Sequence, residues 1–315
     1  MRCGSVRSLL KQTYEEWSHD QIPRLAAALA YYTAFSIAPV LVVVIAVAGL
    51  AFGAAKVQTA IIDQLRGLLG EQGASLVGTM IASALRPRDS RLAMLLGLGA
   101  VLLGASGLFA QLQDALNTVW EVKPRPGRGV WGMLKDRGVS FAMVLAVGFF
   151  LLVTLVVSAA LAGLRGFVDA RLGGAAFVLT TLGLVADFAL TTLLIGLLLK
   201  YLPDVRLRWR HVLPGAAVTS LLFAVGKLAI GAYLGRAAVG SAFGAAGSLA
   251  IVLLWVYYSA QILLLGAELT QVWTRRQGAS IEAKPNAESH RRPEGKCAPV
   301  PAAARAEPAL VAESR

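Results

Sequence analysis

Long apolar segments separated by polar connections form the main pattern along this chain. A helix that crosses the hydrocarbon core of a membrane needs about 20 mostly apolar residues. Six segments reach that length, and each is apolar around its whole circumference rather than on one face. The predicted spans are residues 25–52, 92–113, 139–164, 175–199, 213–235 and 246–272. Because lipid offers no hydrogen bonds to an open backbone, we predict an all-α, polytopic membrane protein with six transmembrane helices.

The connection between the first two predicted spans has a different pattern. Over residues 54–90, Val57, Ile61 and Leu65 recur at helical spacing, and charged residues occupy the other faces. This pattern predicts one or two amphipathic helices that lie on the outer membrane surface or cap the bundle. A packing role and a role as a substrate gate are both open for this outer loop.

Polar segments flank the spans and complete the domain organisation. Residues 1–24 form an N-terminal segment that is too long and too charged for a cleaved signal peptide, so we expect the first span to be retained and to act as the insertion signal. Residues 25–275 hold the six-helix transmembrane domain. Residues 276–315 are rich in Ala, Pro, Glu and Arg without an apolar period, which predicts a disordered tail.

Composition and charge narrow the choice of partners. The chain is 57% hydrophobic and 15% charged, and its formal net charge is +12. A basic chain can bind nucleic acid, but here Lys and Arg gather in both termini and in the connections on the same side of the membrane. The positive-inside rule then places both termini in the cytoplasm. We therefore expect membrane lipids and no nucleic acid as partners, and we predict no particular oligomeric state.

Three ionisable residues lie within the predicted spans: Asp187, Lys227 and Glu268. A charge at the bilayer centre costs on the order of a few kcal/mol, so such groups pair, face the bundle interior or line a wet pathway. From the helical rise, Asp187 and Lys227 differ in depth by about 6 Å, which predicts an ion pair. A structural pair, a substrate or proton site, and a lysine that extends alone toward the interface are the open interpretations.

Glu268 lies near the inner end of its span, too far from Lys227 to be its partner. Two interpretations are open for this carboxyl group. One is an interfacial carboxylate bonded to a neighbouring helix end or to an arginine, and the other is a gating residue.

The first span carries a proline among hydroxyl groups. Pro39 cannot donate a backbone hydrogen bond, which predicts a kink in the helix. Tyr31, Tyr32, Thr33 and Ser36 lie on the N-terminal side of it. A broken, polar-lined helix can frame a binding cavity, and a kink used only for packing is the alternative.

Other polar residues lie on the second and sixth spans. Gln261 is predicted to donate a hydrogen bond between helices, and Gly266 permits a close helix approach. Asp114 and Asn117 lie on a polar stripe, which forms either a cytoplasmic mouth of a pathway or an interface cap.

Four stretches of the chain carry a recognisable family pattern. They are AALAYYTAFSIAPVL (27–41), LNTVW (116–120), GKLAIGAYL (226–234) and GSAFGAAGSLAIVLLWVYYSAQILLLGAEL (240–269). Together with the six-span layout they resemble the YihY/virulence factor BrkB family. The resemblance implies a multi-pass protein of the bacterial inner (plasma) membrane, in a family described as transporters whose substrate is not settled. It supplies no catalytic residues.

Members of that family have also been called ribonuclease BN, and the residues argue against this activity. A metal-dependent nuclease needs clustered His and Asp residues to hold metal ions. The three histidines, His19, His211 and His290, are isolated along the chain. The sequence contains no Walker A loop, nucleophile elbow or Cys/His metal spacing. We predict a protein that is not an enzyme, without catalytic residues, metal or cofactor.

Three functions from different classes compete. The leading hypothesis is a transporter or flippase-like protein for an amphipathic or lipid-related substrate, gradient-driven or passive. Its cavity would be bordered by the first, fourth, fifth and sixth spans. The alternative is a structural or partner-binding membrane scaffold without transport activity. An enzyme acting at the membrane surface is the third.

Overall fold

The computed structural model of the protein is mainly helical. It describes residues 6–85, 91–125, 176–236, 239–278, 281–285 and 287–289, with single positions at 138 and 142. The helices are α1 (Val6–His19), α2 (Ile22–Phe52), α3 (Ala54–Ala84), α4 (Arg91–Val119), α6 (Ala176–Tyr201), α7 (Trp209–Arg236) and α8 (Val239–Arg276). The strands are β1 (Val122–Pro124), β2 (Val205–Arg206), β3 (Glu282–Ala283) and β4 (Ala287–Ser289).

Five of the six predicted spans coincide with helices, namely α2, α4, α6, α7 and α8. By length and composition, four stretches of the described chain could cross a membrane: Ile22–Leu50, Thr181–Tyr201, Trp209–Leu228 and Leu249–Arg276. The predicted span 139–164 lies outside the described residues. The structure therefore supports a membrane protein with several spans, and the count of six stays a prediction.

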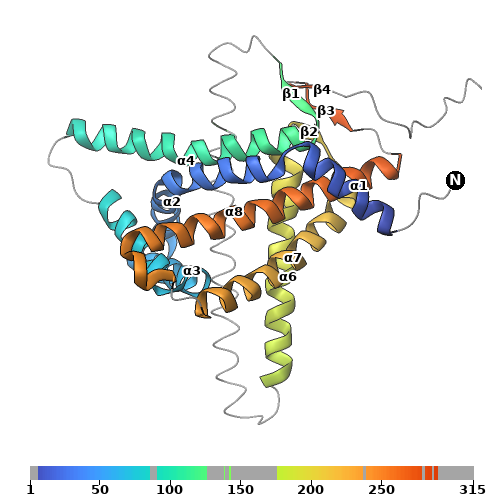
Figure 1. Cartoon of the computed structure of the whole chain (residues 1–315). Coiled ribbons are helices and arrows are strands. Elements are labelled where there is room, and N and C mark those ends of the chain that lie inside the picture. The colour runs from blue at the N-terminus through green and yellow to red at the C-terminus, as the bar shows by residue number, and fades with distance from the viewer. Residues whose placement is uncertain are drawn as a thin grey trace, which may run out of the picture.

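The helices form a bundle with one steep crossing (Figure 1). Helices α2, α4 and α8 run alongside one another, whereas α6 crosses them. The α1 helix and the four short strands lie at one end of this bundle, and α3 lies toward the other. Helix α2 continues through Pro39 as a single helix, so the predicted kink does not interrupt it.

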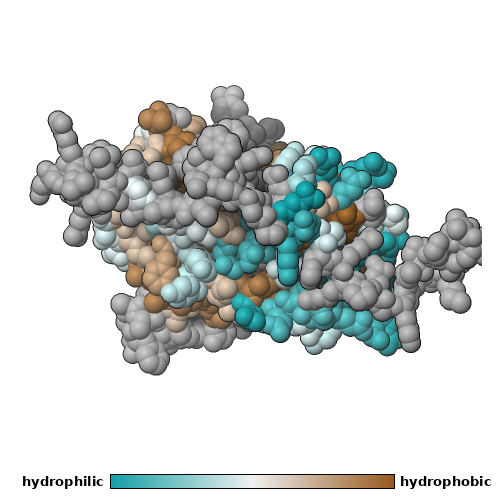
Figure 2. Space-filling model, turned by 90° about the horizontal axis from the view of Figure 1, so that it is seen from above, coloured by the Kyte–Doolittle hydropathy of each residue, from teal (hydrophilic) through white to brown (hydrophobic). Residues whose placement is uncertain are grey.

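The distribution of side chains on the surface fits a membrane protein with one polar end. Figure 2 shows hydrophilic residues concentrated toward the end that carries α1, and hydrophobic residues toward the opposite end. Among the described residues, large apolar side chains such as Phe35, Leu184 and Leu228 are 67%, 68% and 76% exposed. Water disfavours such exposure on several helices together, whereas lipid tails accept it.

The loop predicted to be amphipathic is the kinked helix α3. Gly70 has φ 73° and ψ 177°, a backbone conformation that glycine adopts without strain, and it divides the helix into two segments. The buried face of α3 packs on α2 and α8, and Val57 and Ile61 belong to the same buried cluster as Val44 of α2. Helix α3 therefore caps this part of the bundle, as one of the two predicted arrangements requires.

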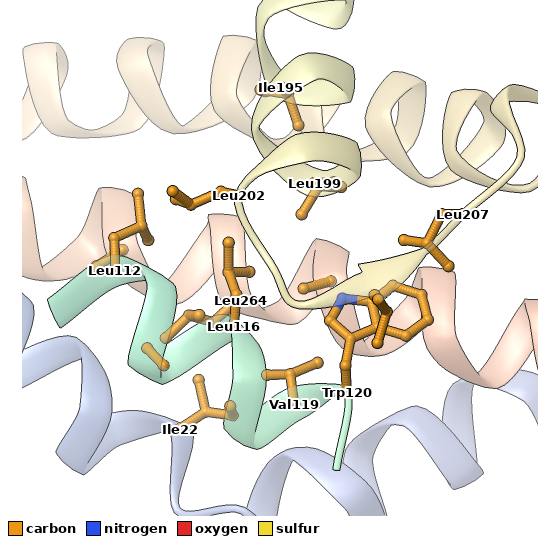
Figure 3. Close-up of a cluster of buried hydrophobic side chains, with 14 of the residues drawn as sticks. Ile22, Leu112, Leu116, Val119, Trp120, Ile195, Leu199, Leu202, Leu207 and Leu264 are labelled. Atoms are coloured by element: carbon orange, nitrogen blue, oxygen red, sulfur yellow. The ribbon is translucent and has the colours of Figure 1, made fainter. Parts of the chain in front are cut away.

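The larger hydrophobic core lies at the polar end of the bundle. Figure 3 shows Ile22, Leu116, Leu199 and Leu264 from four helices gathered in one cluster, with Trp120 at its side near Leu207. Trp120 follows α4 directly and is 2% exposed. This core holds the ends of α2, α4, α6 and α8 in a fixed relation and so positions the polar groups described below.

Helices α7 and α8 interlock through glycine and threonine. A Cβ atom placed at Gly266 would overlap Thr219 Oγ1, and one at Gly215 would overlap Thr270 Oγ1. Each threonine hydroxyl donates to the carbonyl four residues before it in its own helix, over 2.7 Å. The pattern Gly-x-x-x-Thr thus occurs on both helices, and each threonine fills the space left by a glycine of its neighbour.

The segment predicted to be a disordered tail contains two short strands, β3 and β4, among its described residues. Strand β3 pairs antiparallel with β2, and β4 pairs with β1. Lys284 closes the end of α6, because its Nζ donates to the carbonyls of Tyr201 and Pro203 over 3.1 and 2.7 Å. Free carbonyls at a helix end attract such a cation, which explains the docking of a polar segment without an apolar period.

Candidate functional site

An apolar cavity of about 260 Å³ lies between five helices, α2, α4, α6, α7 and α8. Its lining residues are Leu29, Thr33, Leu108, Leu112, Thr191, Leu194, Ile195, Leu198, Phe223, Val256, Ser259, Ala260 and Leu263. Three hydroxyl groups interrupt this apolar wall. Thr33 Oγ1 donates to Leu29 O over 2.7 Å, whereas Ser259 Oγ is buried without a hydrogen-bond partner in the described structure. The cavity therefore suits an apolar group, with the unpaired Ser259 hydroxyl in its wall as a polar contact point.

Among the predicted residues of the first span, Thr33 lines the cavity, whereas the others do not belong to its wall. Tyr31 and Tyr32 are 61% and 43% exposed, and Tyr31 packs on Phe35 with ring centroids 4.9 Å apart. Ser36 is buried against Gly107 of α4, and Pro39 lies against Gly104 of the same helix. The contribution of α2 to the cavity wall is Thr33 together with Leu29.

The structure brings Asp187 of α6 and Lys227 of α7 together. Lys227 Nζ lies 3.4 Å from Asp187 Oδ2, and within the described chain both side chains are partly exposed. Thr191 follows Asp187 by one helical turn, and Phe223 precedes Lys227 by one turn. Both of these residues line the cavity. The ion pair therefore lies about 6 Å along each helix from the cavity wall.

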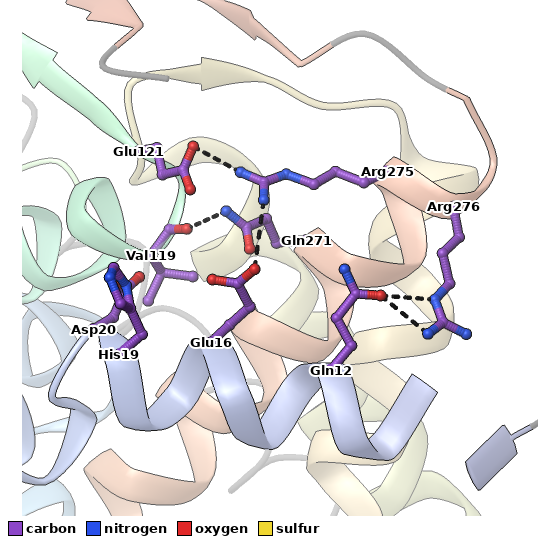
Figure 4. A network of polar contacts seen from close by, with 9 residues as sticks. All are labelled: Gln12, Glu16, His19, Asp20, Val119, Glu121, Gln271, Arg275 and Arg276. Atoms are coloured by element: carbon purple, nitrogen blue, oxygen red, sulfur yellow. Dashed lines mark hydrogen bonds and ion pairs between the residues drawn. The ribbon is translucent and has the colours of Figure 1, made fainter. Parts of the chain in front are cut away.

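A network of charged groups occupies the polar end of the bundle. Arg275 Nη2 of α8 lies 2.8 Å from Glu121 Oε2, and its Nη1 lies 3.9 Å from Glu16 Oε1 of α1. The neighbouring Arg276 donates to Gln12 and Ser8 of α1. Figure 4 shows these contacts joining α1 to the C-terminal end of α8. The network thus fixes the N-terminal helix on the last helix.

Glu268 lies fully buried, 0% exposed, near this network. Asp20, Glu16 and Arg275 are the charged groups that act on it. Within the described residues neither carboxyl oxygen of Glu268 accepts a hydrogen bond from a donor group. Glu268 thus lies near acidic side chains and near an arginine. The interfacial interpretation predicts a neighbouring helix end or an arginine as its bonded partner, but no such bond is formed within the described residues.

Three predicted residues remain: Asn117, which bonds to a neighbouring segment, and Asp114 and Gln261, whose side chains form no such bond within the described residues. Asn117 is buried, donates to Asp204 Oδ2 over 3.1 Å and accepts from the Asp204 amide over 2.8 Å. Asn117 therefore ties α4 to the turn after α6 and acts as an interface cap. Asp114 is exposed, and Gln261 is half-buried on α8. The side chain of Gln261 makes no hydrogen bond within the described part of the chain.

Glu16, Asp20 and Arg275 were missed as candidate residues by the sequence reasoning. The spacing of Glu16 and Asp20 is i, i+4, which is the spacing of neighbours on one helix face. This spacing is visible in the sequence and places both carboxyl groups on one helix face. Because residues 1–24 contain no apolar run, nothing in the sequence indicates that this face packs against another helix.

Substitution of Glu16 tests the electrostatics of the network. Burial is the main cause that raises the pKa of Glu16, Arg275 opposes it, and Asp20 and Glu121 add to it. The folded state therefore holds the proton more tightly than the unfolded state, so stability falls as pH rises through the window above the usual value of 4.5. We expect Glu16→Gln to match the wild type at pH 4 and to melt higher than it near pH 7. Thermal unfolding in detergent at several pH values measures this difference, and a pH-independent difference would contradict it.

Long apolar helices, an apolar cavity between them and charges confined mainly to one end define a polytopic α-helical membrane protein. The sequence profile of the family described as Virulence factor BrkB matches residues 13–291. The chain belongs to this family, as its sequence pattern predicts.

Curated relatives carry the name UPF0761 membrane protein. The chain is 30% identical over 268 residues to the protein of Chromohalobacter salexigens, covering 84% of this chain and 62% of the relative. It is 28% identical over 260 residues to that of Azotobacter vinelandii, with 81% and 60% covered. It is 26% identical over 280 residues to the protein of Photobacterium profundum, which covers 84% of this chain and 82% of that relative. No solved structure matches the chain significantly. These names describe membrane proteins and no enzyme activity.

Proposed function

We propose that the protein is a transporter or flippase-like protein for an amphipathic, lipid-related substrate, gradient-driven or passive. The observation that carries this proposal is the apolar cavity with the Asp187–Lys227 pair one helical turn from its wall. An amphipathic molecule can use both features. Its apolar tail is stabilised in the cavity, away from water, and its polar head group can contact the ion pair. The five helices around the cavity include the first, fourth, fifth and sixth predicted spans.

The size of the cavity restricts the class of substrate. Pockets for drug-sized molecules measure roughly 300–1,000 Å³. The cavity of about 260 Å³ is below that range. It accommodates a segment of one acyl chain rather than a whole phospholipid. We therefore propose that the tail of the substrate enters between the helices while the rest stays in the surrounding lipid.

The same proposal includes the orientation of the chain in the bacterial inner membrane, with both termini in the cytoplasm. Helix α1 and strands β3 and β4 lie at one end of the bundle, which agrees with termini on one side. Basic groups at this end, such as Arg275, Arg276 and Lys284, agree with the positive-inside rule.

A bulky substitution in the cavity tests the proposed transport. Leu194 lines the cavity, whereas the adjacent Leu193 is 45% exposed on the same helix. We expect Leu194→Trp to slow movement of a fluorescent phospholipid across proteoliposomes by about tenfold, because the indole ring takes up space that the acyl chain of the substrate needs, and forcing both into it costs about 1–3 kcal/mol. Leu193→Trp is the matched control and should retain the wild-type rate.

The outcome of this pair of variants decides between transport and a scaffold role. Both proteins should elute as monodisperse species, so that a folding defect is excluded. Equal rates for Leu194→Trp and Leu193→Trp, or no lipid movement by the wild type with and without an ion gradient, would reject the transport proposal in favour of a scaffold.

A further inference from the structure

Two buried carboxyl groups, far apart in the sequence, meet where the junction of α1 and α2 packs on α8. Asp20 lies in this junction, and its side chain is 6% exposed. Glu268 of α8 is 0% exposed. The Asp20 carboxyl group lies within hydrogen-bonding reach of the Glu268 carboxyl group, yet no donor hydrogen joins the two groups when both are ionised. Ionised carboxylates only accept hydrogen bonds, so this contact requires a proton on one of the two groups.

We propose that Asp20 and Glu268 form a proton-binding site in which one proton bridges their two carboxyl groups. No donor in the described residues reaches either oxygen of Glu268, so the bridging proton supplies its hydrogen bond. Gln271, one turn further along α8, directs its amide group at the carbonyl of Val119 instead. A carboxylate buried without a donor is costly, and a shared proton removes that cost.

The charged groups around the pair do not replace the proton. Arg275 of α8 is a cation that acts on Glu268, but it already contacts Glu121 at 2.8 Å and Glu16 at 3.9 Å. Three carboxyl groups thus face Arg275 before Asp20 is counted. His19 Nδ1 lies 3.2 Å from Asp20 Oδ1, with a side chain that is half-exposed. The local balance of charge favours a pair that keeps one proton.

Loss of this proton would place two adjacent negative charges between α1 and α8. These charges repel, which weakens the packing of the α1–α2 junction on α8. The protonation state is therefore linked to the docking of the N-terminal helix. The further step, that an ion gradient acts on transport through this site, rests on the proposed function, whereas the site itself does not.

Infrared spectroscopy of the full chain in lipid vesicles tests the site directly. We expect a C=O stretching band of a protonated carboxylic acid at neutral pH, with the frequency shift that deuterium exchange produces. Glu268→Gln and Asp20→Asn should each abolish this band. Both variants should stay folded, because the introduced amide donates the hydrogen bond that the bridging proton made. Asp187→Asn and Glu16→Gln are the controls and should keep the band.

Absence of the band in the folded wild type at neutral pH would overturn the proposal. A band that persists in both Glu268→Gln and Asp20→Asn would also overturn it. A band with the expected mutational pattern in a protein that moves no lipid would reject the transport proposal and leave the proton site established.

Discussion

Replacement of Gly266 by alanine is expected to separate α7 from α8 and to lower the stability of the protein. The added Cβ would overlap Thr219 Oγ1 and lie 2.9 Å from Thr219 Cβ, so the helices must move apart or the threonine must change rotamer. Overpacking of this kind costs about 1–3 kcal/mol. The sign of the stability change is informative. Alanine is a better helix former than glycine by about 1 kcal/mol, so helix propensity alone predicts that the variant is more stable. The midpoint of thermal unfolding in detergent measures the loss.

Two further variants separate packing from other effects of this substitution. Gly67 lies inside α3, and a Cβ placed there meets no atom within 4 Å. Gly67→Ala should therefore leave the melting midpoint unchanged or raise it. The double variant Gly266→Ala/Thr219→Gly restores the space and should recover part of the loss. Equal midpoints for Gly266→Ala and the wild type would show that this contact does not hold the two helices together.

The helices and the Asp187–Lys227 contact were accessible to sequence reasoning for one physical reason. A helix in lipid must be long and apolar, so its position in the chain is visible without an alignment. The constant rise per residue then converts sequence position into depth, which placed Asp187 and Lys227 at similar levels. The structure brings these two side chains within 3.4 Å.

The cavity wall and the acidic network could not be predicted in the same way. A helix that is apolar on all sides does not show which face meets its neighbours, so Thr33 and Ser259 could not be distinguished from Tyr31 and Gln261. The network depends on the packing of α1 against a helix that lies about 250 residues later in the chain. Local hydrophobic periodicity gives no information about such a long-range contact. Strands β3 and β4 are two and three residues long, which is too short for a recognisable alternation.

The same long-range contact gives the other large expected effect, the loss of Arg275. Arg275→Gln would leave Glu16, Glu121 and the Asp20–Glu268 pair without the cation that faces them. Removing one partner of a buried ion pair costs about 3–5 kcal/mol. The Arg275 side chain is 20% exposed, so we expect about 2–4 kcal/mol here. The thermal midpoint of the protein in detergent should fall accordingly.

The adjacent arginine provides the matched control for this variant. Arg276 donates its hydrogen bonds to the neutral groups of Gln12 and Ser8, so Arg276→Gln removes a charge without exposing a carboxylate. Its effect on the midpoint should be small and independent of pH. The deficit of Arg275→Gln should instead grow as pH rises through the raised pKa of Glu16, because the unpaired carboxylates then ionise and repel one another. If both variants lose the same stability at every pH, the network does not hold α1 on α8 through charge, and side-chain packing holds it there instead.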